Sequence, residues 1–121
     1  MRKKITTDNM IDFACKSIEV EEIIRCSFQL SKTDYEVLVK LMDSEKSTKE
    51  LAEEMELDRS TVHKSVSKLL DQGLVRRRQY NIKSGGYRYV YTAKDREEIK
   101  KKVRSLIENW SSSAKKAVKD W

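Results

Sequence analysis

The stretch DRSTVHKSVSKLLDQG, residues 58–73, decides the fold of this 121-residue chain. Its apolar residues recur at the spacing of an amphipathic helix with one buried face. They are Val62, Val66, Leu69 and Leu70. Asp58 precedes the pattern and can cap the helix, and Gly73 follows it as expected at a left-handed C-terminal stop. The sequence therefore predicts a helix from about Arg59 to Gln72.

Two shorter helical patterns precede this helix, and each starts with a capping box. In this motif a Ser and an acidic residue three positions later each accept the backbone N–H of the other. Ser31 with Asp34 and Ser47 with Glu50 both fit. They predict helices over residues 32–42 and 48–55, and a three-residue turn joins the second one to the amphipathic helix.

After Gly73 the pattern changes from helical to extended. Residues 74–82 and 87–92 are rich in Tyr, Val and Arg, and the loop between them holds two of the chain's three glycines, which predicts a β-hairpin. With Ile82 opposite Tyr87, one face would carry an aromatic ladder that packs on the domain: Tyr80, Ile82, Tyr87, Tyr89 and Tyr91. The other face would carry Arg77, Gln79, Asn81 and Arg88. Stacking of the tyrosines on single-stranded bases is the less favoured alternative.

The order of these elements predicts a winged helix-turn-helix over residues 30–92, which is a mainly α fold with a small β-hairpin. The elements are a helix, a short helix, a turn, the amphipathic helix and the hairpin. In such a fold the second helix of the pair enters the DNA major groove, and the hairpin, or wing, lies along the backbone or in the minor groove. Short polar side chains and Lys or Arg can reach base edges and phosphates there. The candidate contacts on the helix are Arg59, Ser60, Thr61, His63, Lys64, Ser67 and Lys68. Those on the wing are Arg76, Arg77, Arg78, Lys83 and Arg88.

Beyond residue 93, apolar side chains recur every three or four residues, which predicts a long helix that begins at a third capping box, Thr92 with Asp95. A stripe of this length is more than three short helices can cover. A second copy of the chain would bury it, so residues 93–121 are predicted to form a dimerisation helix. Folding back onto its own domain is the alternative. The predicted contacts are Ile99, Val103, Leu106, Trp110, Ala114, Ala117 and Trp121.

Residues 1–29 are predicted to be an N-terminal helical segment that contacts the partner in the dimer. Apolar residues between positions 8 and 26 have a roughly helical spacing, as one helix or two. Cys15 and Cys26 lie here and are expected to be buried as small hydrophobes. A disulfide would require the segment to bend or two protomers to meet.

Charge is distributed unevenly along the chain. The total is 26 Lys and Arg against 20 Asp and Glu, a net charge of +6. Residues 59–104 hold 14 basic and 4 acidic side chains, net +10, whereas residues 1–58 hold 9 and 14, net −5. A protein polarised in this way is suited to bind a polyanion, which favours double-stranded DNA as the partner.

Other chemistries have little support. No apolar run approaches the ~20 residues of a membrane span and no signal-like segment follows Met1, so we expect a cytoplasmic protein with no membrane partner. Two cysteines and one histidine leave few metal ligands, and no catalytic motif stands out, so no enzymatic activity, metal or cofactor is expected. The histidine, His63, lies at the margin of the apolar helix face, where packing and DNA contact are equally favoured.

Several stretches resemble the TrmB-like and MarR-like archaeal transcription regulators. They are LSKTDYEVL (30–38), STKELAE (47–53), LDRSTV (57–62) and LLDQGLV (69–75). The resemblance implies a dimeric winged-helix DNA binder. It assigns base reading to Arg59, Ser60, Thr61, His63 and Lys64, and wing contacts to the region around Arg77 and Arg88. TrmB-type regulators continue into a large sugar-binding domain, and since this sequence stops at Trp121, sugar sensing is not expected.

These observations together predict a homodimeric, sequence-specific transcriptional regulator. Twofold symmetry predicts operator half-sites about one helical turn, ~10 bp, or a multiple of it apart. Two alternatives stay open. One is a nonspecific, chromatin-like DNA-binding protein, with which the +10 region is equally compatible. The other is a winged-helix protein–protein module of the transcription machinery.

Overall fold

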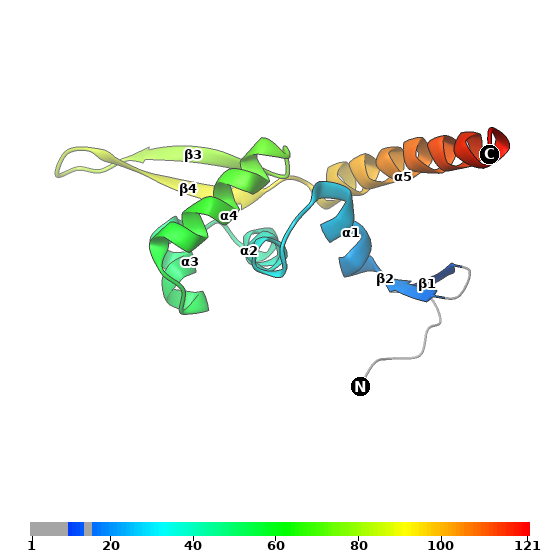
Figure 1. The fold of residues 1–121 in the computed structure, drawn as a ribbon. Coiled ribbons are helices and arrows are strands. Elements are labelled where there is room, and N and C mark those ends of the chain that lie inside the picture. Colours follow the sequence, from blue (N-terminus) through cyan, green and yellow to red (C-terminus); the bar gives the residue numbers. More distant parts are fainter. Residues whose placement is uncertain (1–9, 14–15) are drawn as a thin grey trace.

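The computed structural model describes residues 10–13 and 16–121, which form five helices and two β-hairpins (Figure 1). The elements are β1 (Met10–Phe13), β2 (Lys16–Glu19), α1 (Val20–Phe28), α2 (Lys32–Asp43), α3 (Thr48–Met55), α4 (Arg59–Asp71), β3 (Val75–Asn81), β4 (Tyr87–Ala93) and α5 (Arg96–Lys119). The β3–β4 hairpin projects from one end of the body and α5 from the other (Figure 1). This is the predicted winged helix-turn-helix with a long C-terminal helix.

The helix-turn-helix begins and ends where the sequence predicts because its caps are formed. Ser31 Oγ accepts the N–H of Asp34 at 3.0 Å, and Ser47 Oγ accepts the N–H of Glu50 at 3.1 Å. At the end of α4, Gly73 adopts a φ of 72°, the left-handed conformation that closes a helix. The local sequence therefore fixes the bounds of these helices.

The core lies where α2, α3 and α4 meet the base of the wing. Its largest fully buried side chains are all aliphatic: Val37, Leu38, Leu41, Leu51, Val62, Val66, Leu69 and Leu74. Three of the four apolar residues predicted for α4 are in this set, and Leu70 is half-buried. Each fully buried side chain of this kind contributes about 1.5–3 kcal/mol of transfer free energy, so burial of the α4 face holds this helix in place.

The wing is present, but its register differs from the predicted one. Asn81, and not Ile82, lies opposite Tyr87. The loop contains five residues and is closed by a 3.0 Å hydrogen bond from the Ile82 N–H to the Gly86 carbonyl. Because side chains alternate along a strand, this shift of one residue places Tyr80 on the opposite face from the β4 tyrosines. The prediction of a single aromatic face was therefore wrong.

The N-terminal prediction was correct only for its last part. The helix α1 is present, but residues 10–13 and 16–19 form an antiparallel hairpin instead of a helix. Short apolar runs have too few residues to distinguish a helical from an extended period, which explains the error. Cys26 is exposed on α1, so its predicted burial was also wrong, and Cys15 lies outside the described residues.

The third predicted capping box, at Thr92, does not form. Thr92 belongs to β4, where it pairs with Arg76, so its backbone is committed to the sheet. The helix α5 begins after Asp95, which makes no side-chain capping hydrogen bond. Its first turn instead packs Ile99 into the core.

Candidate nucleic-acid interface

The helix α4 has a buried apolar face and an exposed polar face. The predicted contact residues lie on the polar face: Arg59, Ser60, His63 and Lys64 are exposed, and Thr61, Ser67 and Lys68 are partly exposed. His63 therefore faces solvent and does not pack in the core. Hydroxyl groups and cations on one exposed helix face are the groups that bind base edges and phosphates.

One side chain of α4 that the sequence analysis did not single out ties this helix to α2. Ser65 is 3% exposed, and its hydroxyl donates a 2.6 Å hydrogen bond to Oδ1 of Asp34. The other carboxylate oxygen of Asp34 accepts the N–H of Ser31 in the α2 capping box at 3.0 Å. The Asp34 carboxylate thus takes part in the N-terminal cap of α2 and also positions α4. The sequence could have indicated this buried role, because Ser65 lies between Val62 and Val66, inside the apolar sector of the helix.

Asp58 organises the N-terminus of α4, next to the predicted contacts. Its carboxylate accepts the backbone N–H of Thr61 at 2.8 Å and the hydroxyl of Ser60 at 3.1 Å. Hydrogen bonding by Thr61 lowers the pKa of Asp58 below its ordinary value. Ser60 is therefore already part of the helix cap.

Along the wing, burial decreases from the base to the tip. Tyr91 is buried at the base, Tyr89 is half-buried, and Tyr87 near the loop is 54% exposed. All five predicted wing contacts are exposed: Arg76, Arg77, Arg78, Lys83 and Arg88. The outer half of the wing therefore extends into solvent, beyond the reach of the core.

Arginine and tyrosine side chains contact each other on both faces of the wing. On one face the guanidinium of Arg77 lies 4.3 Å from the ring centroid of Tyr89. On the other face the guanidinium of Arg78 lies 5.0 Å from the ring centroid of Tyr80. Cation–π contacts of this kind contribute about 0.5–1 kcal/mol each at exposed sites.

A carboxylate from the α2–α3 loop holds one face of the wing. Oε2 of Glu45 accepts a 2.9 Å hydrogen bond from the Tyr80 hydroxyl, and Oε1 lies 3.4 Å from Nη1 of Arg78. The hydrogen bond to Glu45 raises the pKa of Tyr80 above its ordinary value. Arg78 is thereby paired within the protein, whereas Arg77 and Arg88 form no ion pair with any residue that the structure describes.

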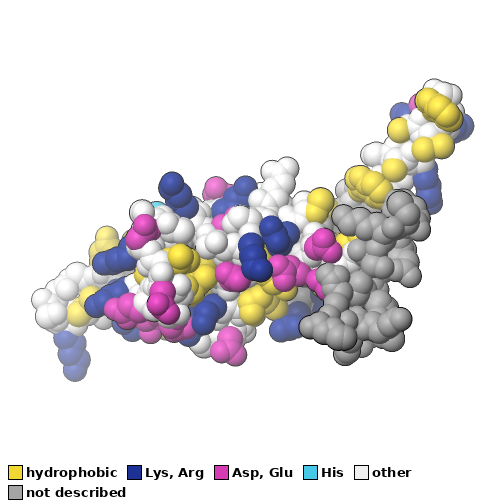
Figure 2. All heavy atoms as spheres, turned by 60° about the horizontal axis from the view of Figure 1, so that its bottom comes forward, with side chains coloured by type: hydrophobic (Ala, Val, Ile, Leu, Met, Phe, Trp, Pro, Cys, Tyr) yellow, Lys and Arg dark blue, Asp and Glu magenta, His cyan; other side chains and the backbone are white. Residues whose placement is uncertain are grey.

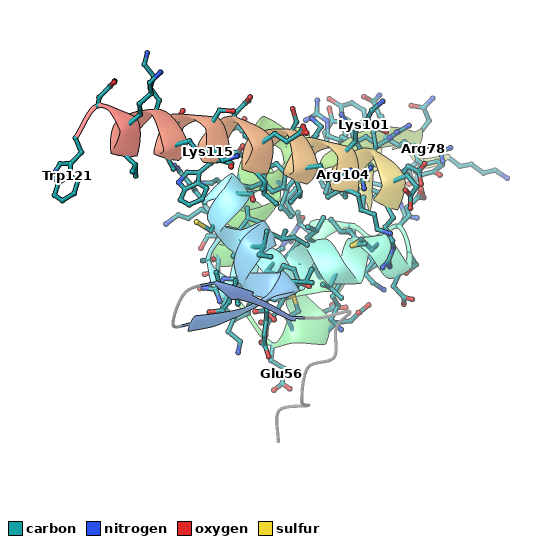
Figure 3. The ribbon with its side chains drawn as sticks, turned by 90° about the vertical axis from the view of Figure 1, so that its right-hand side faces the viewer. Glu56, Arg78, Lys101, Arg104, Lys115 and Trp121 are labelled. Atoms are coloured by element: carbon teal, nitrogen blue, oxygen red, sulfur yellow. The ribbon has the colours of Figure 1, made fainter. Side chains whose placement is uncertain are left out.

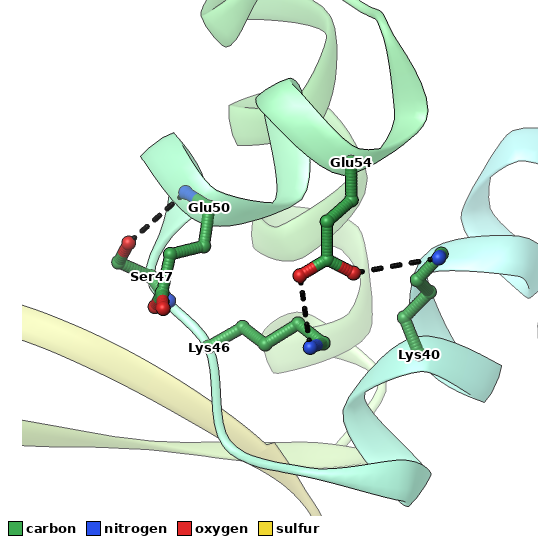
Figure 4. A network of polar contacts seen from close by, with 5 residues as sticks. All are labelled: Lys40, Lys46, Ser47, Glu50 and Glu54. Carbon is green, nitrogen blue, oxygen red and sulfur yellow. Dashed lines mark hydrogen bonds and ion pairs between the residues drawn. The ribbon is translucent and has the colours of Figure 1, made fainter.

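The next residue, Lys46, fixes the base of the wing to α3. Its backbone exchanges two hydrogen bonds with Tyr91, at 3.0 and 2.8 Å, and so forms an isolated antiparallel β-bridge to β4. Its ammonium group lies 3.0 Å from Oε2 of Glu54, whose other oxygen lies 3.4 Å from Nζ of Lys40 (Figure 4). The hydrogen bond from Lys46 lowers the pKa of Glu54. The α2–α3 loop therefore positions the wing relative to the helices.

Acidic side chains are concentrated in one part of the surface. Acidic side chains gather over the face that carries α3 (Figure 2). Viewed along the molecule, Glu56 lies at one side, whereas Arg78 and Lys101 lie at the opposite side (Figure 3). The uneven charge of the sequence is thus visible as an acidic cluster over α3.

The predicted dimerisation helix α5 has a covered and an uncovered part. Ile99 is 5% exposed and belongs to the core, and Val103 packs against it. Farther along, Leu106, Trp110 and Trp121 are exposed, with Trp110 63% exposed. Figure 3 shows Trp121 at the free end of α5. Ala114 is half-buried and Ala117 is exposed. Two further exposed apolar side chains of α5, Ile107 and Val118, were not among the predicted contacts.

Two apolar grooves border this helix on the side of α1. One, of about 310 Å³, lies between α1, α2 and the first turns of α5, and the other, of about 360 Å³, lies between α1 and the middle of α5. Ile23 and Ile107 line both. The two grooves are therefore adjacent along α1 and α5, and we call them together the apolar trough.

Within residues 10–13 and 16–121, no cluster of three or more His, Cys, Asp or Glu side chains is arranged to hold a metal ion. No helix in the same part of the chain is long and apolar enough to cross a membrane.

Comparison with known proteins adds a family and a set of similar structures. The profile of the family described as sugar-specific transcriptional regulator TrmB matches residues 24–97. An uncharacterized protein of Methanocaldococcus jannaschii, MJ1503, is 36% identical over 107 residues, which are 88% of this chain and 81% of that protein.

Among solved structures, a possible transcriptional regulator from Methanosarcina mazei is 33% identical with a TM-score of 0.84, covering 95% of this chain and 98% of that one. An ArsR-like transcriptional regulator from Rhodococcus is 20% identical with a TM-score of 0.54, covering 81% and 86%. The second comparison concerns the fold alone.

Proposed function

The chain belongs to the TrmB family of transcriptional regulators, which are DNA-binding proteins and not enzymes, and from this premise we propose that it is a homodimer that binds specific double-stranded DNA sequences. In the proposal α4 enters the major groove and the wing lies along the backbone or in the minor groove. Residues 30–92 form the DNA-binding domain, 93–121 the dimerisation helix and 1–29 a segment that contacts the partner.

The observation that carries the proposal is the exposed polar face of α4. The three aliphatic side chains on its opposite face are at most 1% exposed, so the helix has one orientation on the body. That orientation presents Lys64 and Lys68 together with the hydroxyls of Thr61 and Ser67. A helix fixed in this way offers hydrogen-bond donors to a groove at little cost in conformational entropy.

The uncovered part of α5 supports the homodimer. Trp110, Leu106 and Ile107 are large apolar side chains exposed beside the trough along α1. A second copy of the chain offers the same apolar stripe, and pairing about a twofold axis would bury the stripes of both copies at once. Contiguous apolar surfaces of this size on a soluble chain mark interaction sites.

A binding series at increasing salt tests the DNA-binding part. We expect fluorescence anisotropy on duplexes from the protein's own promoter region to show tight binding. If the dimer neutralises ~8 phosphates, the slope of log affinity against log salt is about −7. Lys64→Ala and Lys68→Ala should weaken binding, and Thr61→Ala should change the sequence preference. Lys32→Ala, which removes an exposed lysine of α2, is the matched control and should bind as the wild type does.

Three outcomes would contradict this part of the proposal. Affinity that is insensitive to salt would exclude binding to phosphates. Equal affinity of the wild type and all variants for every duplex would leave a nonspecific architectural role. A chain that elutes from heparin without retention and protects no DNA would favour a protein–protein module.

Light scattering coupled to gel filtration tests the dimer. The wild type is expected at the mass of two chains. Trp110→Glu should convert it to a monomer, because a charge in an apolar interface cannot be solvated. Lys101→Glu introduces the same residue on the opposite side of α5 and should leave the mass unchanged. A monomeric wild type, or a dimer that Trp110→Glu leaves intact, would exclude this interface.

A further inference from the structure

The wing has the composition of a surface that binds unpaired bases. Between Val75 and Ala93 the chain carries five Lys or Arg, four Tyr and no Asp or Glu. In the corrected register the four rings differ in burial. Tyr91 belongs to the core, Tyr89 is half-buried against it, Tyr80 is half-buried on the opposite face, and Tyr87 is exposed. Tyr87, next to the loop, is therefore an exposed aromatic side chain in the most basic segment of the molecule.

Three of these side chains form one row on a single face. Tyr87 and Tyr89 contact edge to face, with ring centroids 5.4 Å apart and an angle of 67° between the ring planes. The guanidinium of Arg77 covers Tyr89 from the other strand, 4.3 Å from the ring centroid. Tyr87 is the end of the row and is 54% exposed. The contacts hold Tyr89, while a large part of Tyr87 stays open to a ligand.

The spacing of the row favours separated bases over a base stack. Side chains two residues apart on a strand are roughly 6.6 Å apart, about twice the ~3.4 Å rise per nucleotide of a stacked DNA strand. Aromatic side chains on a positively charged surface bind single strands because every base has a π-face that can stack. A paired duplex presents no such face along its grooves.

We propose that the row of Tyr87, Tyr89 and Arg77 is a binding site for unpaired nucleobases of a DNA strand. Tyr87 stacks on a base, and Tyr89 with Arg77 positions the Tyr87 ring. Lys83 in the loop and Arg88 on the opposite face are exposed and supply positive charge for the flanking phosphates. The site goes beyond the proposed binding of duplex DNA by α4 and uses none of the α4 residues.

Fluorescence anisotropy with the full chain tests the site. The probes are labelled oligothymidylate of about 20 nucleotides and a duplex of the same length. Tyr87→Leu should lower affinity for the single strand roughly five-fold or more while the affinity for the duplex stays within about two-fold. Tyr87→Phe should bind as the wild type does, since it keeps the aromatic face.

Two controls separate a binding role from a structural one. Tyr80→Leu removes a tyrosine from the opposite face of the same hairpin and should leave single-strand affinity unchanged. The thermal unfolding of Tyr87→Leu should match that of the wild type, because Tyr87 is outside the core.

Each result decides the proposal. No binding of oligothymidylate by the wild type at low salt would overturn it. Equal single-strand affinities of Tyr87→Leu, Tyr87→Phe and the wild type would overturn it too, as would an equal loss for single strand and duplex. If Lys64→Ala abolishes duplex binding and single-strand binding persists, both sites stand. If the wild type binds only the single strand, the proposed binding of duplex DNA is contradicted and this inference is not.

Discussion

The helix α4 and the wing both present basic side chains to solvent, but they are held in different ways. Burial of Val62, Val66 and Leu69 fixes α4 along its length, and the hydrogen bond from Ser65 to Asp34 adds a polar tie. The wing is anchored in the core only at its base, and farther out it is held by Glu45. The difference separates a rigid element, suited to reading bases, from a projecting element whose direction depends on few contacts.

The largest expected effect is on the rigid element. Leu69→Ala removes a fully buried side chain and should lower the free energy of unfolding by about 2–5 kcal/mol. Ile82→Ala, in the exposed loop of the wing, should change it by no more than about 0.5 kcal/mol. Urea unfolding followed by circular dichroism measures both. Equal losses would show that the wing contributes to the core as α4 does.

Loss of the hydrogen bond from Ser65 to Asp34 is expected to have a smaller effect on stability. Ser65→Ala removes the donor of a part-buried hydrogen bond to the Asp34 carboxylate, which should cost about 1–3 kcal/mol in the same urea experiment. The matched control is Ser67→Ala, two residues away on the exposed face, which should be close to neutral. If the two variants unfold at the same urea concentration, the Asp34 hydrogen bond does not position α4.

Acid is expected to weaken the helix-turn-helix at its caps. Hydrogen bonds lower the folded-state pKa of Asp58 and of Glu50, the first from Thr61 and the second from Ser47. A lowered pKa stabilises the fold above the pKa of the unfolded chain, and this stability is lost as pH falls through the folded pKa. Melting temperatures from pH 7 down to about pH 3 should therefore fall below pH ~4.

Asp58→Asn provides the control for the acid effect. It keeps a capping oxygen but has no titrating group, so its melting temperature should fall less steeply in acid. Parallel curves for Asp58→Asn and the wild type would place the acid sensitivity elsewhere.

The smallest effect on stability is expected at the wing. Glu45→Gln removes an exposed ion pair with Arg78 and should cost at most about 1 kcal/mol. Its specific signature is the pKa of Tyr80, which Glu45 raises and which should return toward its ordinary value in the variant. Ultraviolet titration of the tyrosines at alkaline pH measures this change. Asp43→Asn changes a charge two residues from Glu45 that forms no hydrogen bond or ion pair with the described wing residues, so it should leave the Tyr80 pKa raised.

The positions of the helices could be predicted because the decisive interactions are local. The caps at Ser31, Ser47 and Asp58 join residues three positions apart, and Gly73 allows the left-handed stop within one turn. The periodicity of α4 likewise identified both its buried face and its exposed polar face. The uneven charge along the sequence also survives in the structure, because the basic helix and wing are adjacent in the chain.

The wing could be predicted as an element but not in its register. A loop of four residues and a loop of five residues both fit a Gly-rich hairpin, and the choice between them reverses which tyrosines share a face. The error hid the separation of Tyr80 from the β4 tyrosines, and the exposure of Tyr87, which the sequence analysis had placed against the body.

The sequence by itself determined the order and bounds of the winged helix-turn-helix, the polar face of α4 and the basic character of the wing. Only the tertiary structure decided which carboxylates accept hydrogen bonds from α4 and from the wing. Ser65 and Asp34 are 31 residues apart, and Tyr80 and Glu45 are 35 residues apart, so no local pattern pairs them. Such pairs form because burial of the aliphatic core brings α2, α4 and the wing together, and that packing is a property of the whole chain.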